Sequence, residues 1–219
     1  ACSARTQLAV DVTDERVVRA RGALCTRRKI GLDVSVGQIA LNVLVFLGDL
    51  VDKKKGGPGD IEDAIALFRF ITGDLGLPLI HVWGNHDVGA GIEDTFPAID
   101  GVYRPDGAEI AATTVPGVPA VFHAANVIAD PDPREVVSHF PTAAGPGHVG
   151  LLHSEVEGQY TKNPCLPTTV DALLSHRYDT WLLGHVHQPV TLHEAPFIGW
   201  VGMASMLELD LPAARHATP

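Results

Sequence analysis

Cysteine is scarce in this sequence, and the cysteines that are present are poorly placed for a shared task. The chain has three, Cys2, Cys25 and Cys165, which lie far apart and show no Cys-x-x-Cys spacing. An odd and scattered set argues against a disulfide framework and against a zinc site built from thiolates. The pattern fits a reducing environment, and we therefore expect a cytoplasmic protein.

A hydrophobic run long enough to cross a membrane is also missing. The longest apolar stretch, residues 39–48, contains Asn42 and stops at Asp49, well short of the roughly 20 residues that a membrane-spanning helix needs. The N-terminus, which begins with Ala1, has no basic segment followed by an apolar one, so no signal peptide is expected. With 46% hydrophobic residues the chain can build one sizeable core, and we expect a single domain over residues 1–219.

Positive charge is in deficit. The formal net charge at pH 7 is −10, which opposes nucleic-acid binding overall because such binding depends on neutralising phosphates. A phosphate substrate would therefore need local positive charge, from bound metal ions or from basic clusters. One cluster lies between Arg19 and Lys29 and another spans residues 53–55; ordinary solvated surface is the alternative interpretation of both.

Four short apolar runs are present, and each ends in a side chain that can bind a metal. Residues 42–47, 77–83, 148–152 and 180–183 are continuous rather than alternating, which is typical of strands covered on both faces. In order, they are followed by Asp49, Asn85, His153, and His185 with His187. Open α/β sheets place ligand crevices just past the carboxyl ends of their strands. An isolated His-x-His would favour an ordinary loop, but four matching strand ends favour a metal site.

Helical patterns lie between these strands. Residues 60–72 carry an apolar face, with Asp60 as the predicted N-cap and Gly73 as the predicted stop. A capping-box pattern that starts at Thr168 predicts a second helix. Strand, helix and strand form a βαβ unit with parallel strands, so two such units are expected. Residues 88–147, rich in Gly and Pro, are expected to supply strands and loops of a second sheet.

The donor atoms indicate the kind of ion. Oxygens of Asp49 and Asn85, combined with the imidazoles of His153, His185 and His187, suit borderline divalent ions such as Mn²⁺, Fe²⁺ or Zn²⁺. A glycine precedes Asp49, Asn85 and His185, and glycine lets the backbone turn sharply at a strand end. The seven histidines outside these motifs and GNHD lack partners at ligand spacing, and we expect them to be solvated or satisfied in the core.

In this order, GDLVD, GNHD, a lone strand-end histidine in LLHSEVEG, and GHVH resemble the motifs of calcineurin-like metallophosphoesterases. HVGLLHSEVEG and NPCLPTTVDALLSHRYDTWLLGHVHQ are similar to the SbcD-type DNA repair exonuclease branch, so the likeness spans roughly residues 40–200. The resemblance implies an α/β fold in which a double β-sheet sandwich is flanked by helices, in four layers α/β/β/α. It also implies hydrolysis of phosphodiester bonds in DNA and an ATPase partner subunit.

The same resemblance implies two divalent metal ions, with Mn²⁺ favoured and Fe²⁺ or Zn²⁺ as alternatives. Asp49 would bridge the two ions. Asn85, His153 and His185 would complete the shell of one ion, and His187 would serve the other. Two cations about 3.5–4 Å apart can activate a water, hold phosphate oxygens and absorb the charge that develops in an in-line displacement.

Two further residues would carry the proton chemistry. The resemblance implies that His86 is the acid near the leaving oxygen and that Asp87 orients it. The chemistry supports the choice of residue type, because a histidine that binds no metal can hold a proton near neutral pH and pass it to a departing alkoxide.

Two family features are missing from this sequence. The first strand of the family ends in Asp-x-His, which supplies two ligands to the second ion, and no Asp-x-His exists here. Asp11 in LAVDVTDE is the best positional match, but Thr13 stands where the histidine should be. We therefore expect one complete metal site, one weak site and an atypical region over residues 1–40. The given sequence also stops soon after Trp200, and we therefore expect no C-terminal capping domain.

Three functions remain open at this point. The first is a two-metal phosphoesterase that acts on DNA. The second is a metal-binding module whose damaged first site has abolished turnover, which Thr13 favours. The third is a phosphoesterase for a small phosphoester, which fits the negative net charge and the missing cap. The intact GNHD and GHVH motifs favour the two enzymes.

Overall fold

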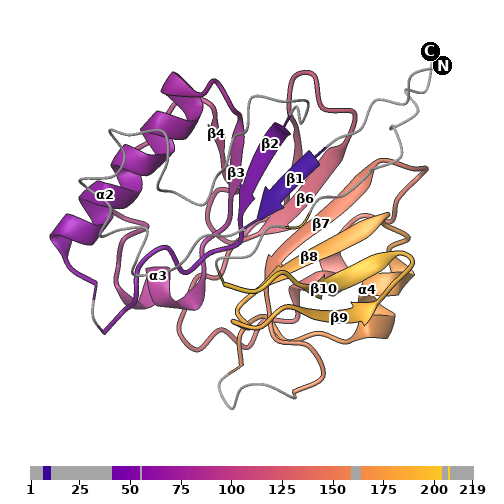
Figure 1. Cartoon of the computed structure of the whole chain (residues 1–219). Coiled ribbons are helices and arrows are strands. Elements are labelled where there is room, and N and C mark those ends of the chain that lie inside the picture. The colour runs from indigo at the N-terminus through magenta and orange to yellow at the C-terminus, as the bar shows by residue number, and fades with distance from the viewer. Residues whose placement is uncertain (1–6, 11–40, 55, 159–163, 204–206, 208–219) are drawn as a thin grey trace.

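The computed structural model describes residues 7–10, 41–54, 56–158, 164–203 and 207. The strands are β1 (Gln7–Val10), β2 (Leu41–Phe46), β3 (Leu79–His81), β4 (Val102–Tyr103), β5 (Ala111–Thr114), β6 (Val121–Ala125), β7 (His148–His153), β8 (Thr180–Gly184), β9 (Val190–His193) and β10 (Phe197–Trp200). The helical elements are α2 (Pro58–Arg69), a π-helical turn η2 (Phe70–Asp74), α3 (Asn85–Gly89), a 3-10 turn η3 (Val136–His139) and α4 (Val170–Ser175). Figure 1 shows how these elements are arranged.

The strands form two separate sheets. The first has the order β1-β2-β3-β4, and all of its strands are parallel. The second has the order β5-β6-β7-β8-β10-β9, with parallel strands in the middle and one antiparallel strand at each edge. α2 connects β2 to its parallel neighbour β3, and α4 connects β7 to its parallel neighbour β8. The two predicted βαβ units are therefore confirmed.

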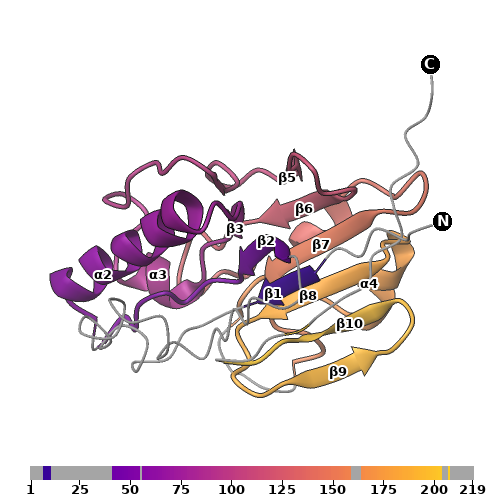
Figure 2. The same ribbon diagram turned by 45° about the horizontal axis from the view of Figure 1, so that its top comes forward.

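Three hydrophobic clusters separate four layers. One lies between the two sheets and includes Val43 and Val45 of β2. The alternate residues of the same strand, Leu44 and Phe46, join α2 in a second cluster. A third cluster, beneath α4 and η3, covers the outer face of the second sheet. β2 is thus buried on both faces, which explains its continuous apolar run, and the α/β/β/α sandwich is confirmed (Figure 2).

The start of α2 differs from the prediction. Its N-cap is Gly57, and the helix begins at Pro58, whose missing N–H costs nothing at this position. Asp60 lies three residues inside the helix, where its carboxylate accepts a hydrogen bond from the Gly57 N–H at 2.7 Å. Beyond Arg69 the helix widens into the π-helical turn η2, which contains the predicted stop, Gly73.

The start of α4 is displaced by one residue. Thr169 is the N-cap, and its hydroxyl accepts a hydrogen bond from the Ala172 N–H at 3.1 Å. Thr168 is instead bonded in an extended segment, where its N–H donates to the Glu155 carbonyl at 3.1 Å. The backbone of Thr168 is therefore paired with Val156 in a β-bridge and does not form the start of the helix.

Several predicted residues fall outside the described part of the chain. β1 ends at Val10, which pairs with Val45 of the parallel neighbour β2. Asp11 follows directly, but Asp11 and Thr13 lie outside the described residues. No helix among the described residues is both long enough and apolar enough to pass through a bilayer.

A pair of histidines lies in the second sheet, away from the strand ends that carry the predicted ligands. The Nε2 atom of His123 is 2.8 Å from the Nδ1 atom of His148, and the ring of Tyr178 stacks on His123 with centroids 4.7 Å apart. His123 is buried. Burial, followed by the charges of His148 and His176, lowers the pKa of His123 to about 4.

Replacing His123 with Phe should make the fold less sensitive to acid. The pKa of His123 is about 4 in the folded chain, against 6.5 for an ordinary histidine, so the unfolded chain binds more protons between these values. The free energy of unfolding therefore falls as the pH drops through this window. Phe keeps the stacking but binds no proton. Between pH 7 and pH 4.5, the free energy of unfolding of His123→Phe should therefore fall by roughly 1–3 kcal/mol less than that of wild type.

Denaturant unfolding at the two pH values measures this difference. The matched control is His139→Phe at an exposed position, which should follow the wild-type pH dependence. An equally steep loss of stability in His123→Phe and in wild type would contradict the assignment.

Candidate metal centre

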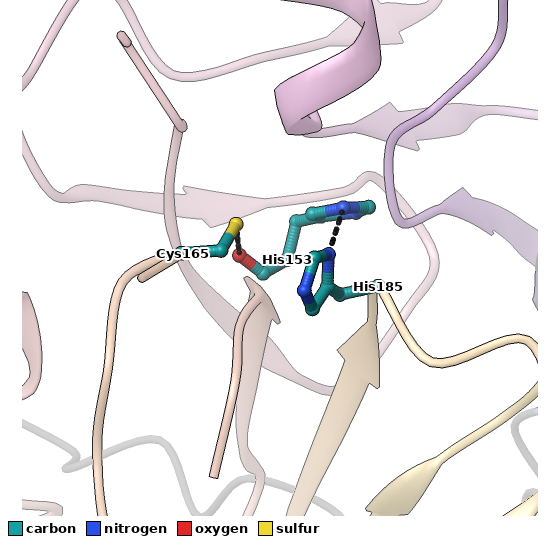
Figure 3. Close-up of side chains that lie close together, drawn as sticks. All are labelled: His153, Cys165 and His185. Carbon is teal, nitrogen blue, oxygen red and sulfur yellow. Dashed lines mark hydrogen bonds between the residues drawn. The ribbon is translucent and has the colours of Figure 1, made fainter. Parts of the chain in front are cut away.

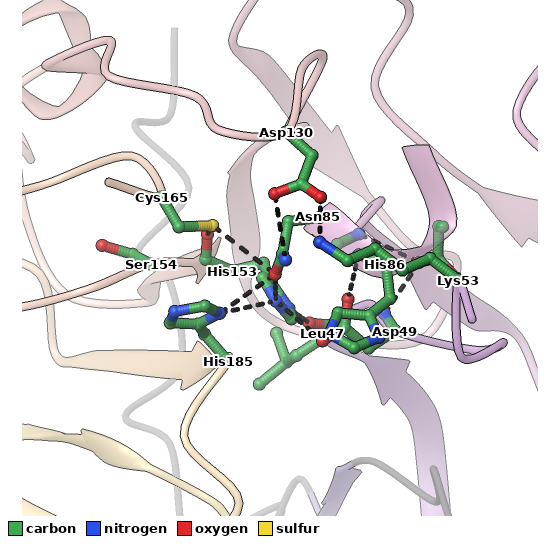
Figure 4. A network of polar contacts seen from close by, with 12 residues as sticks. Leu47, Asp49, Lys53, Asn85, His86, Asp130, His153, Ser154, Cys165 and His185 are labelled. Atoms are coloured by element: carbon green, nitrogen blue, oxygen red, sulfur yellow. Dashed lines mark hydrogen bonds and ion pairs between the residues drawn. The ribbon is translucent and has the colours of Figure 1, made fainter. Parts of the chain in front are cut away.

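Four of the predicted ligands come together where β2, β3, β7 and β8 end (Figure 4). The Nε2 atom of His153 is 3.1 Å from the Oδ1 atom of Asn85 and 3.2 Å from the Oδ2 atom of Asp49. The Nδ1 atom of His185 is 3.1 Å from the same Asn85 oxygen and 3.3 Å from the His153 Nε2 atom. These four side chains, called here the strand-end cluster, thus direct their donor atoms toward one another.

The hydrogen bonds of His153 leave one of its nitrogens directed at oxygen acceptors. Its Nδ1 atom lies 2.6 Å from the carbonyl oxygen of Leu47 and donates its proton there. In a neutral ring, Nε2 then carries a lone pair and faces the oxygens of Asn85 and Asp49. Lone pairs that face one another at this point favour a shared cation, either a proton on Nε2 or a metal ion. A backbone carbonyl on the second ring nitrogen is also the usual support of a metal-bound histidine, so the donor set fits a divalent ion.

The electrostatics of the cluster favour positive charge at this point. Burial acts to raise the pKa of Asp49, but the charge of His153 and the hydrogen bond to it outweigh burial and lower the pKa. Burial acts to lower the pKa of His153, but Asp49 outweighs it and raises the pKa. Burial and the neighbouring charge of His153 lower the pKa of His185 to about 4, which keeps its ring neutral at pH 7. A metal ion could take the place of the proton on His153.

The cluster is held by strained backbone. Gly48 has a φ of 91°, and the side-chain-bearing residues Asp49 and His185 have φ values of 57° and 93°. Such conformations cost about 1–3 kcal/mol each in a residue with a side chain and concentrate at functional sites. The N–H of His86 donates to the Oδ1 atom of Asp49 at 2.8 Å, which fixes the carboxylate in this conformation.

The glycines before the cluster residues serve two different purposes. At Gly48 the positive φ requires glycine, as the sequence suggested. Gly84 has an ordinary φ of −96°, but a Cβ there would lie 2.5 Å from the Asp49 nitrogen and 2.8 Å from a carbon of the His153 ring. Gly184 is similar, since a Cβ would lie 2.9 Å from the Nδ1 atom of His153. At these two positions glycine provides space rather than rotation.

Asp87 contacts backbone rather than the imidazole of His86. It is fully buried, and its carboxylate accepts hydrogen bonds from the N–H groups of Asp49 at 2.7 Å, Gly84 at 2.9 Å and Val51 at 3.3 Å. Burial and the charge of Asp49 raise its pKa, while these N–H groups act to lower it. Asp87 therefore fixes the turn that carries Asp49.

His86 has a different acidic neighbour from the one expected. Its Nδ1 atom lies 3.5 Å from the Oδ2 atom of Asp52, and its side chain is 30% exposed. The carboxylate beside the His86 ring is thus that of Asp52 and not that of Asp87. Asp52 comes from the same GDLVD motif as Asp49, and its carboxylate is more exposed than that of Asp87.

The second ion's ligands are not assembled in the described residues. The ring of His187 is exposed and makes no hydrogen bond or ion pair with another described residue. Its backbone carbonyl accepts a hydrogen bond from the Met203 N–H at 2.9 Å. Asp11, the other expected ligand, lies outside the described residues. The structure thus brings together one set of four ligands.

Three residues beside the cluster were not among the predicted ligands. Asp130 lies 3.5 Å from the Asn85 amide nitrogen and forms an ion pair with Lys53 (Figure 4). Cys165 lies on the other side, with its Sγ atom 3.9 Å from the Asn85 Oδ1 atom. Lys53 belongs to the predicted basic cluster, but Asp130 and Cys165 come from loops without hydrophobic periodicity.

Comparisons with known proteins agree with this fold. The sequence profile of the calcineurin-like phosphoesterases matches residues 32–199. The chain belongs to the calcineurin-like phosphoesterase family, a family of metal-dependent hydrolases. The match is to the family as a whole and does not distinguish its branches. A search of curated proteins found no match.

One solved structure shares the fold at low sequence identity, and a second has a lower structural similarity. A dimetal phosphatase from Danio rerio has a TM-score of 0.53 and 12% identity, covering 91% of this chain and 88% of that one. The protein TT1561 of Thermus thermophilus has a TM-score of 0.46 and 14% identity, covering 97% of this chain and all of that one. At 12% identity, the likeness to the Danio rerio phosphatase shows a shared fold and nothing more.

Gly84→Ala should disrupt the strand-end cluster. The added methyl group would push Asp49 and His153 apart, so we expect the affinity for Mn²⁺ to fall at least tenfold. The free energy of unfolding should fall by about 1–3 kcal/mol, as for other overpacked sites. Calorimetric metal titration and denaturant unfolding measure the two effects.

Gly59→Ala is the matched control, because a Cβ at Gly59 has no atom within 4 Å. It should bind metal as wild type does and be at least as stable, since Ala favours a helix more than Gly. Wild-type metal affinity in Gly84→Ala would contradict the proposed packing role of this glycine.

Proposed function

We propose that this chain is a metal-dependent phosphodiesterase that hydrolyses DNA. The observation that carries the proposal is the convergence of Asp49, Asn85, His153 and His185 on one point, with the His153 Nε2 atom facing two oxygens. Asp49, Asn85, His153 and His185 would hold a divalent ion there, and such an ion would polarise a phosphate oxygen and lower the pKa of a bound water. A site for two ions is supported by the resemblance of GDLVD, GNHD and GHVH to the motifs of the family.

The chain's own residues would position the substrate and move a proton. His86 is half-buried and outside the cluster, and its ring faces Asp52, so it can hold a proton and give it to the leaving oxygen. Lys53 lies beside Asp130 next to the cluster. It would provide local positive charge for a phosphate in a protein whose net charge is −10.

DNA as the substrate rests on the two stretches that resemble the repair exonucleases. An ATPase partner subunit and Mn²⁺ as the preferred ion come from the same resemblance, although Fe²⁺ and Zn²⁺ also suit the donor set. A cytoplasmic location belongs to the proposal because of the few, scattered cysteines.

A catalytically impaired metal-binding module is the second candidate. It is favoured by the exposed ring of His187 and by Thr13, which offers no nitrogen donor to the second ion. We propose that this ion, held by Asp49, His187 and Asp11, binds weakly. A phosphoesterase for small phosphoesters is the remaining alternative, and the net charge of −10 favours it.

Two variants should separate proton transfer from metal binding. His86→Ala removes the proposed acid, so turnover of a nitrophenyl phosphodiester with Mn²⁺ should fall by about 10²- to 10⁴-fold. Its tighter metal site should stay within about twofold of wild type, because the ring is not a ligand. His185→Ala removes a ligand and should weaken metal binding itself. Steady-state kinetics and calorimetric titration give both quantities.

The outcomes also separate the candidate functions. Cleavage of linear duplex DNA together with the nitrophenyl diester supports the proposal. Cleavage of the small diester alone supports the small-phosphoester enzyme, and tight metal binding without turnover supports the module. Equal loss of metal in both variants would show that the roles of His86 and His185 are misassigned.

A further inference from the structure

The strand-end cluster has a neighbour that differs chemically from its other donors. Cys165 is 2% exposed, and one ligand atom each from His153, Cys165 and His185 lie within 4.8 Å of one another (Figure 3). We propose that the Cys165 sulfur is a further ligand of the ion held by Asn85, His153 and His185, and that it makes this position prefer Zn²⁺ over Mn²⁺. The inference rests on the proposed metal centre and, at this one position, replaces the Mn²⁺ of the proposed function with Zn²⁺.

The distances fit one shared ion. The Oδ1 atom of Asn85 lies 3.1 Å from nitrogens of both His153 and His185, and 3.9 Å from the sulfur of Cys165. Neighbouring ligand atoms on one Zn²⁺ ion are separated by about 3–4 Å, given bonds of about 2.0–2.3 Å. A side-chain rotation that moves the sulfur by about 1 Å would therefore bring it into the coordination shell.

The backbone around Cys165 holds the thiol in place. The carbonyl of Cys165 accepts a hydrogen bond from the Glu155 N–H at 2.8 Å, just beyond β7. Cys165 also forms a bridge with Asp132, a buried residue. The next residue, Leu166, has a φ of 43°, and such strain persists only where the surrounding structure determines the conformation. The approach of the sulfur to the cluster is therefore built into the fold.

The present partner of the sulfur is weak. Its thiol donates to the carbonyl oxygen of His153 at 3.4 Å. Cys165 is also the one cysteine in the described part of the chain, where it is free and buried. A cation would replace the weak S–H contact with a metal–sulfur bond, and the thiol proton would pass to buffer.

A sulfur donor changes which ion the site prefers. Thiolates select softer ions such as Zn²⁺ and Fe²⁺, whereas Mn²⁺ prefers carboxylates, carbonyls and water. Without Cys165, the cluster offers two oxygens and two nitrogens, which discriminate little among these ions. With this thiol as a ligand, we expect the position to bind Zn²⁺ most tightly and Fe²⁺ next. We expect the weaker second position to bind a harder ion.

Cobalt titration provides a signal that does not depend on catalysis. Co²⁺ bound to a thiolate absorbs in the near ultraviolet through sulfur-to-metal charge transfer, and Co²⁺ bound only to oxygen and nitrogen does not. The full-length wild-type chain should develop this band at one equivalent of Co²⁺. Cys165→Ser, which nearly preserves volume, and Cys165→Ala should both lack it. The double variant Cys2→Ala, Cys25→Ala should keep it, because Cys165 is then the sole thiol.

Competition titrations test the preference itself. In Cys165→Ser the affinity for Zn²⁺ should fall at least tenfold, while that for Mn²⁺ changes less than about threefold. Circular dichroism confirms folding, and Cys165→Ala provides a second variant if the serine is poorly tolerated. Metal binding without a sulfur band and with an unchanged Zn²⁺ to Mn²⁺ ratio would overturn the role of Cys165 and leave the metal centre intact. No Co²⁺ binding by wild type would overturn the metal centre as well.

Discussion

The hydrogen bond between the ring of His153 and the carbonyl of Leu47 is the constraint on which the rest of the centre depends. His153 ends β7 in the second sheet, and Leu47 follows β2 in the first, so this bond ties the two sheets together at the site. It also fixes the ring so that Nε2, and not Nδ1, faces Asp49 and Asn85. A change in the spacing of the two sheets would therefore alter both the tautomer of His153 and its distance from the other ligands.

The packing beneath the site maintains that spacing. Val45 and Leu47 of the first sheet share a cluster with Leu151 and Leu182 of the second, and these residues are almost fully buried. Glycine at position 184 then lets the second sheet approach the Leu47 carbonyl without a clash. The site is thus placed by a dry core of closely packed strands, and this core offsets the strained backbone of the cluster. Buried Asp87 completes the support from the other side by binding the Asp49 N–H.

The sequence predicted those parts of the fold that depend on hydrophobic continuity. β2, β7 and β8 follow continuous apolar runs, and their parallel pairing follows from the helices between them. It also predicted that Asp49, Asn85, His153 and His185 would meet, because parallel strands deliver their carboxyl ends to one edge. His187, which was predicted with them, is exposed instead. The predicted helix starts were less accurate. Asp60 and Thr168 can each act as an N-cap or bond to backbone in another way, and only the tertiary structure determines which of these two roles they take.

The residues that sequence reasoning missed are those placed by loops. Cys165 and Asp130 follow no period and belong to no strand, so nothing local indicates that they approach Asn85. The scarcity of cysteine argued against a thiolate zinc site of the usual spacing, yet one thiol can join histidines supplied by distant strands. The sequence also does not show why positions 84 and 184 need glycine. It cannot distinguish a glycine needed for a positive backbone φ from one needed because a Cβ would clash.

The central claim is that His153, Asp49, Asn85 and His185 share one ion. The most direct measurement is an anomalous difference map from crystals grown with Zn²⁺ or Mn²⁺. We expect a peak about 2.0–2.2 Å from the His153 Nε2 atom, with oxygens of Asp49 and Asn85 and a nitrogen of His185 around it. A map in which this position is empty while His153 Nε2 remains hydrogen-bonded to Asp49, or in which the metal lies elsewhere, would contradict the claim.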